Sequence, residues 1–177
     1  MNTTLNKIKA HNPCESGWRK LLSHLGKIEA DDEPLPFLII LESNGIEDAI
    51  WSLLTCDDKR AVRLFACDCA ESVLHLFEKK YPEDDRPRKT IEVARRFANG
   101  EATQEELDKA RDAAWDAWDA ARASTDAAYA AAWAAARDVW AAARAAWDAA
   151  RATARDAAWD ADAERQKQAE LFKKYFG

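Results

Sequence analysis

Apolar residues recur every three or four positions in most of the segment from residue 16 to residue 98, which is the spacing of helices that bury one face. No stretch alternates apolar and polar residues for long enough to predict a strand. Residues 1–15 are polar and carry no such pattern, so we predict no packed element there. The sequence therefore predicts an all-α fold, with a short apolar segment over 36–42 and helices over 16–26, 46–54, 58–80 and 87–98.

Residues that favour helix ends mark the borders of these segments. Asp57 is expected to cap the helix that follows it, and Gly100 stands where a left-handed residue commonly ends a helix. Pro87 suits a first helical turn, because the N–H that proline lacks would have no partner there. Thr103 is followed three residues later by Glu106, which predicts a capping box at the start of the next helix.

The last third of the chain has a different composition. Neither Gly nor Pro occurs between Thr103 and Phe176, and 28 of the 54 residues from Ala110 to Ala163 are alanine. Alanine is the strongest helix former, so we predict long helices rich in alanine and tryptophan. Ser, Thr and Asp favour helix caps, which makes 123–126 the expected break, and one continuous helix is the alternative.

On a helical projection this segment has three faces. One is alanine, one is aspartate, and the third combines tryptophan with arginine four residues away. The alanine face suits close packing against another helix, in the same chain or in a second copy of it. The tryptophan–arginine face is either the edge of the core or an exposed surface for a stacked, nucleotide-like ligand. Its candidate binding residues are Trp133, Arg137, Trp140, Arg144, Trp147 and Arg151.

Composition narrows the class of protein. The chain has 177 residues, a formal net charge of −6 and no apolar run long enough to cross a membrane. A general nucleic-acid binder usually carries a basic face, so the acidic balance argues against that class. The N-terminus lacks the apolar stretch of a secretory signal, and we therefore expect a cytoplasmic protein.

The four cysteines and three histidines form no recognisable metal or catalytic motif. Cys67 and Cys69 are two residues apart in a predicted helix, so their thiols point to opposite sides and cannot hold one metal ion. Buried, reduced thiols are the simpler interpretation. The sequence also lacks a phosphate-binding loop, a nucleophile elbow and a zinc-protease motif. We therefore expect no cofactor, no metal and no enzymatic activity.

A distinctive string crosses the junction between two predicted helices. It consists of Cys67-Asp68-Cys69-Ala70-Glu71 and, after a loop, Asp84-Asp85-Arg86-Pro87-Arg88-Lys89-Thr90-Ile91-Glu92-Val93-Ala94-Arg95. With this string, residues 50–120 resemble the immunity proteins of bacterial toxin–immunity loci, which tend to carry an alanine-rich helical tail. The resemblance implies a non-enzymatic inhibitor that binds and neutralises a protein partner, either a toxin or a defence effector. The acidic net charge suits a basic partner.

The same string predicts a helix junction. Aspartate at its start can accept hydrogen bonds from backbone N–H groups, and proline sets the direction of the chain. The residues expected in this junction are Asp68, Glu71, Asp84, Asp85, Pro87 and Glu92. Arg86 and Arg88 are expected to bind carboxylates of the preceding helix, such as Asp68 or Glu71, and so to hold the junction together. Binding of the partner is their alternative role.

Gly100 divides the predicted bundle. Residues 1–100 are expected to form an N-terminal helical layer, and residues 101–177 an alanine-rich tail that packs on it within one compact domain. Two functions remain open at this point. One is inhibition of a protein partner, and the other is sequestration of a nucleotide-like small molecule on the tryptophan–arginine face.

Overall fold

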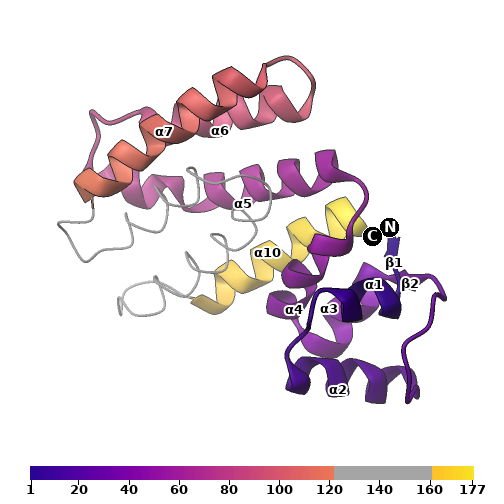
Figure 1. The fold of residues 1–177 in the computed structure, drawn as a ribbon. Helices are drawn as coiled ribbons and strands as arrows, with labels where there is room; N and C mark the ends of the chain where they lie inside the picture. The colour runs from indigo at the N-terminus through magenta and orange to yellow at the C-terminus, as the bar shows by residue number, and fades with distance from the viewer. Residues whose placement is uncertain (122–160) are drawn as a thin grey trace.

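The fold is described from a computed structural model, in which residues 1–121 and 161–177 are placed (Figure 1). Its elements are β1 (Asn2–Thr3), α1 (Leu5–Ala10), α2 (Glu15–Leu25), β2 (Leu35–Pro36), α3 (Phe37–Asn44), α4 (Ile46–Ser52), the 3-10 turn η1 (Leu53–Thr55), α5 (Lys59–Lys80), α6 (Arg86–Ala98), α7 (Gln104–Ala121) and α10 (Ala161–Phe176). None of the helices described is long and apolar enough to cross a membrane.

The all-α fold class predicted from the sequence is confirmed. The described residues contain one departure from it, because β1 and β2 pair as a two-stranded antiparallel sheet of two residues each. The register places Asn2 opposite Pro36 and Thr3 opposite Leu35. This pairing is too short to give an alternating pattern, so sequence periodicity could not predict it.

Most of the predicted helix borders are confirmed. Gly100 adopts a φ of +76°, the left-handed conformation that glycine tolerates, directly after the end of α6. The capping box is also present: the Glu106 N–H donates to Thr103 Oγ1 at 3.2 Å, and the Thr103 N–H donates to Glu106 Oε2 at 2.7 Å. The cap of α5 differs by one residue. Asp58, not Asp57, accepts the Ala61 N–H at 2.9 Å.

Helix α1 lies in the region for which no packed element was predicted. It has six residues, and its apolar side chains Leu5 and Ile8 are buried. Thr4 caps it by accepting the Lys7 N–H at 3.1 Å. A helix this short is stabilised mainly by tertiary packing, so two apolar positions among polar neighbours gave too weak a signal.

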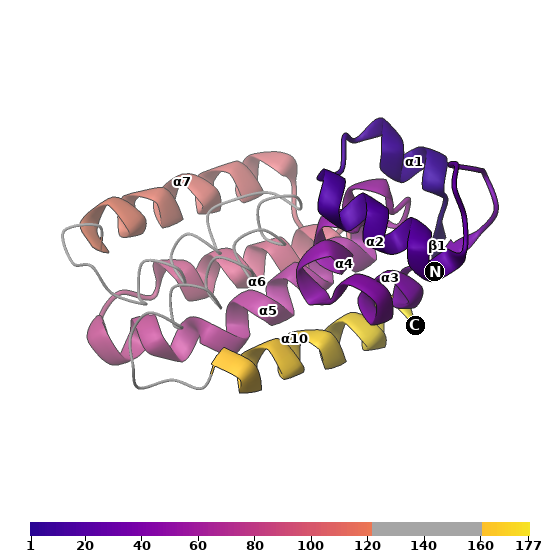
Figure 2. The ribbon, with the colours of Figure 1, turned by 90° about the horizontal axis from the view of Figure 1, so that it is seen from below.

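One apolar cluster joins the N-terminal helices to α5 and to the C-terminal end of α10. It contains buried residues of α1 to α4, the first half of α5 and the end of α10. Phe172 and Phe176 of α10 are fully buried, and their rings contact Phe65 at centroid distances of 5.8 and 5.5 Å. Figures 1 and 2 show α10 running beside α5 with its last turn among the N-terminal helices.

Helices α5, α6 and α7 pack in sequence on one another at the other end of the molecule (Figure 1). Ile91 and Thr90 are the buried residues in the middle of α6. The Thr90 hydroxyl lies 2.8 Å from the Ala110 carbonyl of α7 and 2.9 Å from the Arg86 carbonyl of its own helix. This threonine therefore fixes α7 against α6.

Candidate functional site

The predicted helix junction lies between α5 and α6, and its first contact is local. Asp84 Oδ1 accepts the Arg86 backbone N–H at 3.2 Å and the Arg86 Nε–H at 2.7 Å, while Oδ2 accepts Nη2 at 2.5 Å. The hydrogen bonds from Arg86 hold the pKa of Asp84 below its ordinary value. Pro87 is buried in the first turn of α6, as the sequence predicted. Asp84 and Arg86 thus form a closed turn that starts α6.

Arg88 binds a carboxylate of the preceding helix, as predicted, but that carboxylate is Glu78 and not Asp68 or Glu71. Arg88 Nε and Nη2 lie 2.7 and 2.8 Å from the two carboxylate oxygens of Glu78. The pairs expected for Arg86 and Arg88 are made by Arg95, which binds Asp68 and Glu71. Sequence spacing cannot give the register of two antiparallel helices, and Arg95 lies two turns further along α6.

Asp68 is the most highly connected carboxylate of this junction. Its Oδ1 accepts Arg95 Nη1 at 2.5 Å, and its Oδ2 accepts the Tyr175 hydroxyl at 2.8 Å and Lys174 Nζ at 3.1 Å. Only 14% of the side chain is exposed. Burial by itself raises the pKa of Asp68, but the hydrogen bonds from Tyr175, Arg95 and Lys174 outweigh it and leave the pKa below its ordinary value. One side chain therefore links α5, α6 and α10.

The remaining acidic residues of the string face solvent. Asp85 precedes α6 and pairs with Lys89 one turn later at 2.8 Å, with both side chains more than half exposed. Glu92 is exposed on the outer side of α6, in the same row as Lys89 and Arg96. An exposed ion pair such as that of Asp85 and Lys89 adds little to the stability of the fold. Because their side chains face solvent, Asp85 and Glu92 are accessible to a partner.

The buried thiols of α5 do not suit nucleophilic catalysis. Burial raises the pKa of Cys67 to about 11 and raises that of Cys69 well above its ordinary value. Both thiols are therefore protonated at neutral pH, and the thiolate is the nucleophilic form. Within residues 1–121 and 161–177, no group of three His, Cys, Asp or Glu side chains could hold a metal ion.

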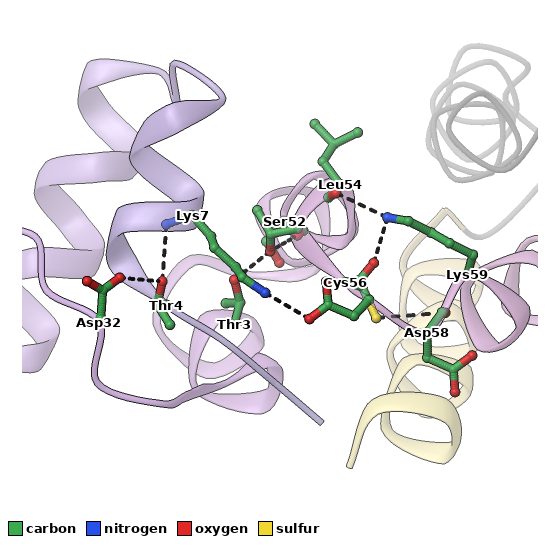
Figure 3. Close-up of polar contacts among 11 residues, drawn as sticks. Thr3, Thr4, Lys7, Asp32, Ser52, Leu54, Cys56, Asp58 and Lys59 are labelled. Atoms are coloured by element: carbon green, nitrogen blue, oxygen red, sulfur yellow. Dashed lines mark hydrogen bonds and ion pairs between the residues drawn. The ribbon is translucent and has the colours of Figure 1, made fainter.

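A second set of polar contacts joins β1 and α1 to the segment between α4 and α5 (Figure 3). The buried hydroxyls of Thr3 and Thr55 lie 2.6 Å apart, and Lys7 Nζ binds Asp57 Oδ2 at 2.8 Å. Lys59 Nζ donates to the Cys56 carbonyl at 2.6 Å, close to the end of η1. These contacts hold β1 and α1 against the residues that lead into α5.

Residues 101–121, which include α7, carry an excess of acidic side chains. Residues 101–121 contain seven Asp or Glu and two Lys or Arg, a formal charge of −5, against −6 for the whole chain. Glu101, Glu105 and Asp112 are exposed. Glu106 is also exposed, and the hydrogen bond from the Thr103 N–H keeps its pKa below the ordinary value. The exposed surface of residues 101–113, which we call the α7 acidic face, is therefore charged at neutral pH.

The string lies within a segment of the chain that matches a known protein family. The family described as "Imm-5 like putative immunity protein" matches residues 52–174. The chain belongs to this family. No curated protein and no solved structure matches the chain.

The family match divides this Imm-5-like protein unequally. It includes α5, α6, α7 and nearly all of α10, and with them Asp68, Arg95 and the α7 acidic face. It begins within α4, so that α1 to α3 lie outside it. The six residues predicted on the tryptophan–arginine face, Trp133, Arg137, Trp140, Arg144, Trp147 and Arg151, lie outside the residues that the structure describes, as do 123–126 and the alanine face beyond α7.

Proposed function

We propose that this Imm-5-like chain is a non-enzymatic immunity protein that binds a toxin or effector protein and neutralises it. The family match over residues 52–174 carries the proposal. The chemistry of the described side chains is consistent with it, because the thiols of α5 are buried and protonated. The arginines of the shared string are paired with carboxylates of the same chain, which is a structural role.

The partner that we propose has a basic surface, and the α7 acidic face is its proposed contact. Glu101, Glu105 and Asp112 are exposed there, in a region of formal charge −5 that lies within the family match. Opposite charges steer two proteins together and raise the association rate, with a strong dependence on ionic strength. The arginines between α5 and α6 are less suited to this task, because their positive charge would repel a basic partner and they are bound to carboxylates of the same chain.

The proposal is tested by protection of a bacterial host. Cells that express the toxic protein encoded in the same locus should grow when the chain is co-expressed and should die without it. The variant Glu105→Lys/Asp112→Lys reverses two exposed charges of the α7 acidic face, and we expect it to weaken the complex roughly tenfold at low salt.

A matched control reverses two exposed charges elsewhere. Glu29 and Glu42 lie in the N-terminal layer, outside the family match, and Glu29→Lys/Glu42→Lys changes the net charge by the same amount. This control should protect as well as the parent does. Equal loss of protection in both variants would show that only net charge matters. Full protection by the α7 variant would place the binding surface elsewhere.

A further inference from the structure

The buried residues of α5 belong to two different environments. Ala61, Val62, Phe65 and Cys69 are part of the apolar cluster that includes the N-terminal helices and the end of α10. Val73 and Phe77 are also buried, but they lie outside that cluster, as does Ile91 of α6. Cys69 is the last residue of α5 in the cluster, and the buried residues of α5 beyond it lie outside the cluster, so this helix is shared by two packed regions.

A row of polar contacts runs along the seam between α5 and α6. Near the start of α5, Arg60 donates to the Asn99 side chain at 2.8 Å, and the Arg63 guanidinium lies 4.6 Å from the centre of the Phe97 ring. Further along α5, Asp68 and Glu71 bind Arg95 of α6. Near the end of α5, Glu78 binds Arg88. Arg60, Asn99, Glu71 and Arg88 are exposed, and the other side chains of this row are half-buried. The buried apolar residues of α6 are Pro87, Ile91 and Ala98. A contact of this kind opens more readily than an apolar core.

Asp68 stands at the border of the two regions and bonds to both. On one side it binds Arg95 of α6, and on the other it binds Lys174 and Tyr175 of α10. The turn of α10 that contains these two residues packs into the apolar cluster of the N-terminal helices through Phe172 and Phe176. The loss of either set of partners would leave a mostly buried carboxylate incompletely bonded, which is unfavourable for the other set as well.

We propose that α6 and the packed part of α7 form an arm that opens from α5 as a unit, and that Asp68 couples the opening of this arm to the seating of α10. The device does not depend on the proposed function, because it concerns motions of the free protein. The coupling accounts for the position of the Asp68 carboxylate, which belongs to α5 and bonds to residues of both α6 and α10.

Hydrogen exchange of the full chain, measured by mass spectrometry, tests the arm. Amides of α6 should exchange faster than those of α3 and α4. Added salt should accelerate exchange in α6 but not in α3 or α4, because exposed ion pairs are screened and an apolar core is not. Equal rates in all these helices, or a salt response shared by all of them, would overturn the proposal, since the chain would then open as a single unit.

Three variants test the coupling. Asp68→Asn should accelerate exchange roughly tenfold or more in both α6 and α10, because hydrogen bonds to a charged group are lost on both sides. Glu78→Gln weakens another pair of the α5–α6 seam and should accelerate exchange in α6 alone. Tyr175→Phe is the mildest change, since it removes only the hydroxyl that donates to Asp68 and keeps the ring against Phe65.

The Tyr175→Phe variant decides the matter even if Asp68→Asn folds poorly. Coupling predicts faster exchange in α6, although the substitution is made in α10. Unchanged exchange in α6 would overturn the coupling, and so would an Asp68→Asn effect confined to one of the two helices.

Discussion

The packing of α10 gives the sharpest prediction about stability, and Phe172→Ala is the perturbation that tests it. Phe172 is fully buried, and its ring lies 5.8 Å from the ring of Phe65 and 4.9 Å from that of Phe176. Removing a buried phenylalanine side chain costs about 3–5 kcal/mol, because apolar burial is lost and a cavity remains. Domains of this size are stable by about 5–15 kcal/mol, so the variant should lose a large part of its stability.

The assay is urea unfolding followed by circular dichroism, with linear extrapolation to water. Lys173→Ala is the matched control one residue away, because the Lys173 side chain is 54% exposed and its pair with Glu170 is a surface contact. The control should change the free energy of unfolding by less than about 0.5 kcal/mol. A loss below about 1 kcal/mol for Phe172→Ala, with an unchanged m-value, would refute the reasoning: α10 would not be part of the core.

Three further predictions concern charges and thiols. Arg88→Ala removes a half-exposed ion pair with Glu78 and should lower the free energy of unfolding, measured in urea, by about 0.5–1 kcal/mol. A urea unfolding curve like that of the parent, together with loss of partner binding, would favour the alternative role of Arg88 in binding. A thiol reagent at pH 8 should modify the exposed Cys14 of the folded protein and leave Cys67 protected until unfolding, as followed by mass spectrometry; equally fast modification would contradict the burial that raises the pKa of Cys67 to about 11. The pKa of Asp68 in the folded protein lies below its ordinary value. The Asp68 carboxylate therefore stabilises the fold fully above about pH 4, and this stabilisation is lost as the pH falls through the folded-state pKa. Asp68→Asn should be most destabilising near neutral pH, and its difference in stability from the parent should shrink in acid.

Local signals in the sequence were sufficient for most of the helices. Gly100 ends α6 and the pair Thr103 and Glu106 starts α7 as expected, because these effects involve only neighbouring residues. Helix α1 was missed for the opposite reason. Leu5 and Ile8 are apolar positions in a polar stretch, and only the cluster that buries them makes the segment helical.

The contacts of the junction needed the structure, since they depend on how helices far apart in the sequence are placed. The string correctly indicated a structural link between α5 and α6, but only the register of the two helices shows that Arg95, and not Arg88, reaches Asp68. The part played by Lys174 and Tyr175 had no signal at all, because about 100 residues of sequence separate them from Asp68.

Direct titration of the purified toxin with the purified chain tests the central claim, which is neutralisation by binding. The activity of the toxin should fall in proportion to the amount of chain added and reach zero at a fixed molar ratio, with a complex isolable at that ratio and the mass of the toxin unchanged. Loss of toxin activity at far less than one equivalent, with a change in the mass of the toxin, would show catalysis and contradict the account. Full toxin activity in an excess of the chain would contradict it as well.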